Sequence, residues 1–300
     1  MRKIIPAMGK NRDPYIFMCG GRYLRCFSRG GNQIVVEAAD RPDGFASAQG
    51  TVVYTAEEGT AFSKEYWAPE IHILDGTCWL YVACDDGDNH NHRMVVLGND
   101  SKDPLSPYRL RGKLSAPTDR WAIDGTVMRC GEKLYFVWSG WEGSVNTAQN
   151  LYIAGMKSPY ELSCDRVLLS RPEYDWEKRG ATGQPESPFI NEGPCAFYAD
   201  GATYLAYSAS GSWCEDYCIG LMKLVGSDPM NPADWKKLPH PILGRTDQAK
   251  GCGHCSILNE NGRLTMFFHA WDQSETAIRW DTVSTWAAEL TINKGEIKIL

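Results

Sequence analysis

The sequence lacks the features that would place the protein in a bilayer or on a nucleic acid. It contains no apolar run of the length that a membrane-spanning helix needs. Its formal net charge of −6 leaves no basic excess for a phosphate backbone. The first ten residues, MRKIIPAMGK, hold only a short apolar stretch where an export signal needs a sustained one. We therefore expect a cytoplasmic protein without nucleic-acid or membrane partners.

The pattern of cysteines also lacks a disulfide framework. The chain has 11 cysteines, an odd number, and most of them lie inside apolar stretches that are typical of strands. There they alternate with other core residues, as small hydrophobic side chains do. This usage favours a reducing compartment over a fold held together by disulfides.

Helical periodicity is weak, and the chain contains a repeated hairpin instead. Five segments share an apolar stretch, a turn with glycine and a second strand rich in aromatic residues; the turn glycines are Gly20 or Gly21, Gly76, Gly131, Gly201 and Gly262. Successive turns lie about 55 to 70 residues apart by subtraction, which suits a four-stranded unit with loops of variable length. Residues 282–290, near the C-terminus, have the best helical pattern, but they also fit a strand that leads into a tight turn at Lys294 and Gly295.

Five such units around one axis predict an all-β fold, a five-bladed β-propeller that residues 1–300 form as a single domain. In this architecture the innermost strand of each blade starts near the central channel, so the residues just before these strands surround one mouth. The alternative is a β-sandwich whose Asp-Gly and Asn-Gly turns repeat by chance. A sandwich would leave the acidic residues at equivalent places in the repeat unexplained.

An acidic residue stands at the head of three of the five hairpins, namely Asp13, Asp124 and Glu192, while Glu70 and His254 head the other two. Hydrolysis of a glycosidic bond needs a proton donor and a second carboxylate that acts at the anomeric side. A third carboxylate near the donor keeps the donor's pKa high by like-charge repulsion. Each acid alone is more often a turn former, so the prediction of catalysis depends on three acids in register.

These segments resemble those of glycoside hydrolase family 43, five-bladed propeller enzymes that act on arabinose- and xylose-containing polysaccharides. The matching pieces are RDPYIF, YWAPEIHILDGTCWLYVA, WAIDGTVM with KLYFVWSG, the EGP of NEGPCAFY, and GCGHCS, in the family's order from residue 12 to about residue 270. The resemblance implies that Asp13 is the general base, Asp124 the carboxylate that adjusts the pKa, and Glu192 the general acid of an inverting reaction. Glu186, a rival donor in the preceding loop, lacks the EGP context.

The same resemblance indicates residues that bind the sugar. Trp67, in YWAPE, resembles a tryptophan near the family's sugar pocket, with packing within the blade as the alternative. One of Trp121, Trp138 and Trp141 should offer its face to a sugar ring, and we name Trp141 as the candidate. Arg279, in AIRWD, is similar to a late arginine that many relatives direct into the pocket.

His254, in GCGHCS, matches a position where relatives place a channel histidine that contacts an ion, commonly calcium, largely through waters. A hard cation prefers oxygen ligands, so such an ion would be structural or electrostatic, and we expect no required cofactor. A histidine bonded to water is the alternative. Cys252 and Cys255 frame His254 as C-x-x-C, yet no matching second pair exists at the spacing of a zinc site.

Residues 85–93, DDGDNHNHR, also resemble a metal-binding run because they combine three aspartates with two histidines. A solvated loop near the substrate mouth is the alternative, in which Asn91 and His92 are the side chains that could touch substrate.

The expected activity is that of an inverting, exo-acting α-L-arabinofuranosidase on short arabinan or arabinoxylan fragments. β-Xylosidase and endo-arabinanase are alternatives within the family, and a related propeller enzyme acting on fructans or galactans is a third. A non-catalytic propeller that binds carbohydrate is the alternative from another class, since a fold does not fix a function.

Overall fold

The computed structural model describes residues 1–5, 12–293 and 296–300, and over these residues the chain is built from β-strands. The described part also holds four short 3₁₀ helices: η1 (Pro42–Ala46), η2 (Asn89–Asn91), η3 (Asp175–Glu177) and η4 (Pro232–Asp234). None of the helices in this part of the chain has the length and apolar character to cross a membrane. The all-β prediction is confirmed, while the turn predicted at Lys294 and Gly295 lies outside the described residues.

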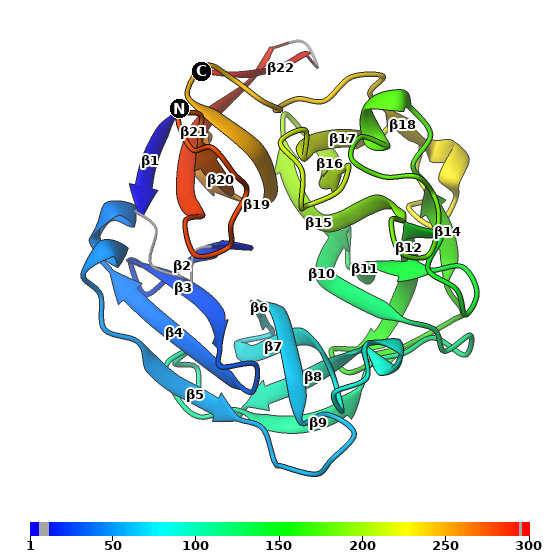
Figure 1. The fold of residues 1–300 in the computed structure, drawn as a ribbon. Helices are drawn as coiled ribbons and strands as arrows, with labels where there is room; N and C mark the ends of the chain where they lie inside the picture. The colour runs from blue at the N-terminus through cyan, green and yellow to red at the C-terminus, as the bar shows by residue number, and fades with distance from the viewer. Residues whose placement is uncertain (6–11, 294–295) are drawn as a thin grey trace.

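The described strands pair into five antiparallel groups around a central axis, and the first strand of each group is the innermost (Figure 1). The first blade consists of β2 (Tyr15–Cys19), β3 (Arg22–Arg29), β4 (Gln33–Ala39) and β5 (Thr51–Thr55), and the second of β6 (Lys64–Leu74), β7 (Thr77–Asp85), β8 (Arg93–Asn99) and β9 (Arg109–Lys113). The third consists of β10 (Ala122–Cys130), β11 (Lys133–Trp141), β12 (Ala148–Ser158) and β14 (Val167–Ser170), and the fourth of β15 (Phe189–Ala199), β16 (Ala202–Ala209), β17 (Cys218–Leu224) and β18 (Trp235–Lys237). The fifth consists of β19 (Ala249–Glu260), β20 (Arg263–Asp272), β21 (Ser284–Asn293) and β1 (Arg2–Ile5). Two short strands pair antiparallel with the ends of longer ones: β13 (Glu161–Leu162) with β12, and β22 (Glu296–Ile299) with β21. A short parallel contact between β12 and β15 links the third and fourth blades.

The hydrophobic core of the described residues is divided into five clusters, one between each pair of neighbouring blades. Val36 of the first blade and Leu80 of the second belong to one cluster, and Tyr81 of the second and Phe136 of the third belong to the next. A β-sandwich would have one core between two sheets. The division of the core therefore excludes the sandwich and agrees with the propeller.

Pairing between the two ends of the chain closes the ring. Strand β1 pairs antiparallel with β21, so the N-terminal segment is an outer strand of the last blade. Ile5 is fully buried there, in the cluster that also contains Ile16 of the first blade and Phe267 of the fifth. Closure thus packs the first blade against the last and fixes where the strand heads meet.

The head of each innermost strand has the same backbone irregularity. A residue with positive φ stands there in every blade: Asp13 (φ 53°), Ala68 (φ 43°), Asp124 (φ 55°), Gly193 (φ 54°) and His254 (φ 46°). In β6, β10, β15 and β19 the pairing register shifts at this residue, as it does at a β-bulge. A bulge bends the strand and redirects the side chains beside it. In these four blades the bulge therefore turns the residue towards the mouth of the ring, whereas Asp13 lies just before β2, which pairs without a shift.

We expect Ile5→Ala to lower the free energy of unfolding by about 2–5 kcal/mol, because it removes buried methyl groups from the cluster that closes the ring. Urea unfolding followed by tryptophan fluorescence measures the change. Ile73→Ala is the matched control, since Ile73 is 43% exposed and should change stability much less. A loss for Ile5→Ala no larger than that of the control would mean that closure by β1 contributes little to stability.

Candidate active site

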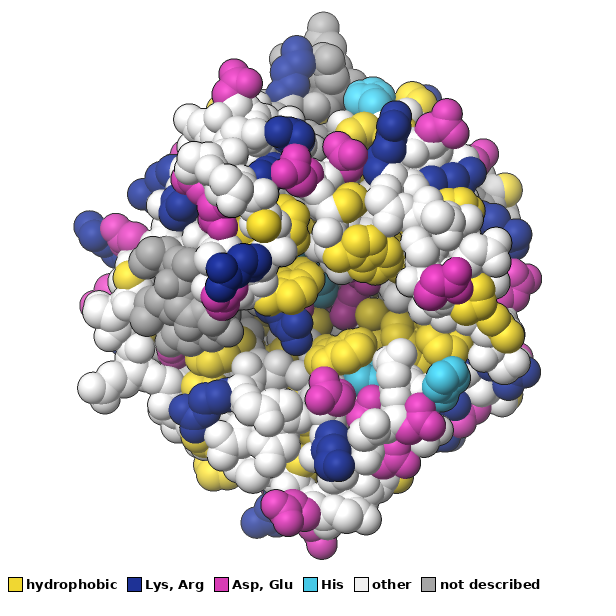
Figure 2. Space-filling view, in the orientation of Figure 1, with side chains coloured by type: hydrophobic (Ala, Val, Ile, Leu, Met, Phe, Trp, Pro, Cys, Tyr) yellow, Lys and Arg dark blue, Asp and Glu magenta, His cyan; other side chains and the backbone are white. Residues whose placement is uncertain are grey.

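Asp13, Asp124 and Glu192 line a single cavity of about 260 Å³ at the mouth of the ring. The three acids that the sequence analysis selected therefore lie together, although they come from the first, third and fourth blades. Figure 2 shows the mouth as a hollow near the centre of the molecule, with hydrophobic side chains around it and acidic side chains deeper inside. Aromatic walls rise from this floor, formed by Trp67, Trp121, Trp213 and Trp280.

The three acids do not occupy identical positions in the repeat, which corrects one premise of the sequence analysis. Asp13 and Asp124 are the positive-φ residues of their blades, but in the fourth blade that residue is Gly193, and Glu192 precedes it. In the second blade the equivalent residue is Ala68 rather than Glu70. Glu192 thus reaches the cavity from one residue before the bulge.

Asp13 is held by two histidines of the fifth blade. Its backbone N–H donates to Nδ1 of His269 at 3.1 Å, and its Oδ1 lies 3.1 Å from Nδ1 of His254 and 3.3 Å from Nδ1 of His269. Burial alone would raise the pKa of Asp13, but the charge of the nearby His254 outweighs it and lowers the pKa well below its usual range. Asp13 is therefore ionised at any working pH, and its side chain, 21% exposed, can reach a water.

His254 provides the compensating charge for the acids. Its Nδ1 lies 3.9 Å from Oδ2 of Asp124 as well as near Asp13, and its backbone N–H donates to Oγ of Ser208 at 2.7 Å. Burial disfavours a charged imidazole, but the carboxyl groups of Asp13, Asp124 and Glu192 outweigh it and raise the pKa of His254 to about 9. His254 is thus a cation at neutral pH.

Glu192 and Asp124 have raised pKa values because both are nearly buried. Burial, reinforced by the charge of Asp124, raises the pKa of Glu192 to about 8. Burial also raises the pKa of Asp124 to about 6, against the opposing charge of His254. Oδ2 of Asp124 accepts a hydrogen bond from the backbone N–H of Gly193 at 3.1 Å, which fixes it next to Glu192. At pH 7, therefore, Glu192 holds a proton that Asp13 does not.

Tyr217 and His269 belong to the site, but the sequence analysis did not find them. The hydroxyl of Tyr217 donates to Oε1 of Glu192 at 2.8 Å, and its ring stacks on His269 with centroids 5.5 Å apart. Gly253 lies against this ring, where an added Cβ would come within 1.8 Å of a ring atom. The glycines of GCGHCS were the one sequence signal for this aromatic packing, because glycine is needed where a large side chain packs directly on the backbone.

Of the chosen sugar-binding residues Trp67, Trp141 and Arg279, the structure places only Trp67 on the cavity. Trp141 is buried behind Trp121 and stacks on it with centroids 4.8 Å apart, so Trp121 is the one that faces the cavity. Arg279 pairs with Asp281, and its side chain is 64% exposed. The arginine that lines the cavity is Arg12, whose guanidinium lies over the ring of Trp280.

The residues near His254 do not fit a metal ion held directly by the protein. Among the described residues, no group of three or more His, Cys, Asp or Glu side chains is arranged to hold a metal, and Nδ1 of His254 is already paired with Asp13. Burial raises the pKa of Cys252 to about 12, so its thiol stays protonated and is a poor zinc ligand. A calcium ion held through waters stays a prediction.

Comparisons with known proteins agree with this geometry. The model of the family "Glycosyl hydrolases family 43" matches residues 6–297. An extracellular exo-α-(1→5)-L-arabinofuranosidase of Streptomyces chartreusis is 28% identical over 90% of this chain and 83% of its own length. Alpha-L-arabinofuranosidase 43 of Humicola insolens is 30% identical over 71% of this chain, which spans only 43% of that protein. The crystal structure of an α-L-arabinofuranosidase from Lactobacillus brevis superposes with a TM-score of 0.86 at 27% identity, covering 99% of this chain and 94% of that one.

We expect Tyr217→Phe to raise the pKa of Glu192 further. The tyrosine hydroxyl donates to the carboxylate, which favours the ionised form and lowers the pKa, so its loss shifts the titration to higher pH. Carboxyl ¹³C NMR of glutamate-labelled protein measures the titration, with Glu192→Gln to assign the signal. The control is Tyr207→Phe, since the Tyr207 hydroxyl donates to Glu177 instead. A Glu192 titration that is identical in wild type and Tyr217→Phe would contradict this account.

Proposed function

The chain belongs to glycosyl hydrolase family 43, and we propose that it releases terminal α-L-arabinofuranosyl residues from arabinan or arabinoxylan oligosaccharides, with inversion at the anomeric carbon. In this reaction Asp13 takes a proton from the attacking water, and Glu192 gives one to the departing oxygen. Asp124 keeps Glu192 protonated and in place. No step passes through a metal ion.

The separation of two pKa values within one cavity is the observation that carries the proposal. The charge of His254 holds Asp13 ionised, whereas burial and Asp124 keep a proton on Glu192 up to a pH of about 8. Carboxyl groups whose surroundings drive their pKa values apart are suited to act as a base and an acid in the same reaction. Activity should therefore decline as the pH rises above about 8, because Glu192 then loses the proton that it must donate.

The size of the cavity and the relatives' names support the choice of substrate. A cavity of about 260 Å³ lies below the range of about 300–1,000 Å³ for sites that enclose drug-sized ligands, which suits one terminal sugar. Both curated relatives described above are named as arabinofuranosidases, as is the solved structure from Lactobacillus brevis. A cytoplasmic location and a calcium ion held through waters remain further parts of the proposal.

We expect the protein to hydrolyse 4-nitrophenyl α-L-arabinofuranoside and to leave the β-D-xylopyranoside nearly untouched. Release of nitrophenol measures both reactions, and Asp13→Ala is the blank, because it removes the carboxylate proposed to activate the water. Preference for the xyloside would replace the proposed activity with that of a β-xylosidase. Binding of arabinan fragments by the folded protein without turnover of any of them would identify a carbohydrate-binding module instead.

A second variant tests the assignment of the acid. Glu192→Ala should lose about 10²–10⁴-fold in kcat/KM on arabino-oligosaccharides, whose leaving oxygen must be protonated. It should lose far less on an aryl arabinofuranoside with a highly activated leaving group, which departs without a proton. The ratio of the two losses is the measurement. Equal losses on both substrates would show that Glu192 is not the proton donor.

A further inference from the structure

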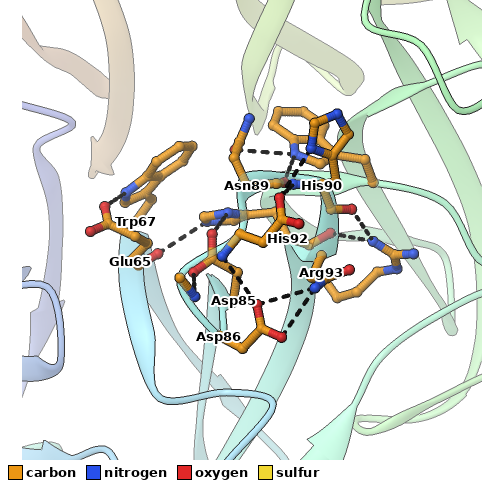
Figure 3. A network of polar contacts seen from close by, with 12 residues as sticks. Glu65, Trp67, Asp85, Asp86, Asn89, His90, His92 and Arg93 are labelled. Atoms are coloured by element: carbon orange, nitrogen blue, oxygen red, sulfur yellow. Dashed lines mark hydrogen bonds and ion pairs between the residues drawn. The ribbon is translucent and has the colours of Figure 1, made fainter.

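The loop of residues 85–93, the metal-like run DDGDNHNHR, lies between the two aromatic walls of the cavity. His92 is fully buried, so it cannot touch a substrate in the cavity. Its ring nevertheless packs on Trp67, with the ring centroids 4.0 Å apart and the planes tilted by 31°, and its centroid lies 6.2 Å from that of Trp121. Figure 3 shows His92 in the centre of a polar network, with Trp67 and Glu65 on one side.

Polar groups lie beside both ring nitrogens of His92. Nε2 lies 3.0 Å from the backbone carbonyl oxygen of Glu65, to which it donates. Nδ1 lies 2.7 Å from Oδ2 of Asp85, close enough for an ion pair when the ring is protonated, and both side chains are almost completely inaccessible to solvent. The hydrogen bond from Nε2 therefore anchors the ring, with Asp85 on its other side and Trp67 against it.

The backbone that carries Trp67 needs such support. Glu65 and Ala68 both have positive φ, 51° and 43°, a conformation that costs a residue other than glycine of order 1–3 kcal/mol and persists only where its surroundings enforce it. Oε2 of Glu65 accepts a hydrogen bond from Nε1 of Trp67 at 3.1 Å. The bond from His92 to the Glu65 carbonyl thus holds the same residue that orients the indole.

The opposite wall depends on the same loop. Nε1 of Trp121 donates to the backbone carbonyl of Asn89, in η2, at 2.8 Å. Arg93 holds this turn of the loop by donating to the backbone carbonyls of His90 and His92. One loop therefore supports the wall formed by Trp67 and the wall formed by Trp121.

We propose that His92, held by Asp85, is a positioning residue that fixes Trp67 in the wall of the cavity and so sets the affinity for the terminal sugar without contacting it. The proposal rests on the proposed function, because it takes the sugar to bind against Trp67. On this account the buried residues of the run, Asp85 and His92, and the backbone of its turn support the two aromatic walls, and the run is not a metal site.

The test is His92→Phe, which keeps an aromatic ring but removes both polar contacts. KM for 4-nitrophenyl α-L-arabinofuranoside should rise about three- to tenfold, the range expected when net hydrogen bonds are lost, while kcat changes less than about twofold. In a Trp67→Ala background the same substitution should raise KM no further, because the residue through which His92 acts is gone. An equal rise in KM in both backgrounds would overturn the proposal, as would a loss confined to kcat.

A matched control separates positioning from general destabilisation. Glu37→Gln breaks another buried pair, in which Glu37 lies 2.5 Å from the Arg25 guanidinium, in the first blade and away from the residues that line the cavity. It should lower the thermal midpoint of unfolding and leave KM unchanged. If Glu37→Gln raises KM as much as His92→Phe does, the effect of His92 is only loss of stability, and the proposal is wrong.

Crystal structures of wild type and His92→Phe give a readout that needs no turnover. In the variant we expect the Trp67 indole to be displaced or to occupy more than one orientation. An indole in the wild-type position, with its bond to Glu65 intact, would refute the positioning role even if the protein proved to have another activity. Absence of turnover in wild type would contradict the proposed function, and the crystal structures would still decide the role of His92.

Discussion

The active site depends on one backbone constraint, the left-handed residue at the head of each innermost strand. Such a residue costs of order 1–3 kcal/mol when it is not glycine, so each needs partners that hold it. Three heads find theirs in a neighbouring blade: the N–H of Asp13 donates to His269, that of Gly193 to Asp124, and that of His254 to Ser208. The bonds that stabilise the strained heads thus also join adjacent blades.

The chemical groups of the site are themselves part of these bonds. Asp124 accepts from Gly193 with the carboxyl group that sits beside Glu192, and His254 is anchored through its backbone while its ring faces Asp13. Closing the ring therefore places three carboxyl groups and an imidazole in one desolvated space. Burial raises the pKa of the enclosed acids, and the histidine charge lowers that of Asp13. The pKa values of the base Asp13 and the acid Glu192 therefore differ because the two residues lie at different places relative to His254.

Local sequence patterns were enough to predict the hairpins and the three acids, because turn glycines and apolar strands are short-range signals. Gly76, Gly131, Gly201 and Gly262 all stand at the turn between the first two strands of a blade, as expected. The offset of Glu192 was missed because the bulge that causes it is a property of the paired strands. Tyr217 and His269 were missed because they lie outside the repeated heads and reach the acids only through packing between blades.

The wrong choices among the aromatic and basic candidates have a similar cause. Trp121 and Trp141 lie in the same stretch of sequence, and only their stacking decides which one faces the cavity and which one is buried behind it. Arg279 and Arg12 are far apart in sequence, yet both lie beside Trp280, and the partner that each finds decides which one lines the cavity. Sequence spacing contains no information on such pairings.

The floor and the walls of the cavity are built by different parts of the fold, so the catalytic acids and most of the aromatic residues around the sugar stand on different segments. The acids stand on or just before inner strands that ring closure fixes. Walls such as Trp213 and Trp280 stand on connecting segments, which vary more easily than strands. Trp67 is an exception, since it belongs to inner strand β6 and also lines a neighbouring hollow of about 460 Å³. Its indole borders two hollows that both reach Asp13, so its orientation affects how much room the terminal sugar has. A wall with that role needs rigid support from behind, and a buried histidine that donates to the Glu65 carbonyl and lies against Asp85 provides it.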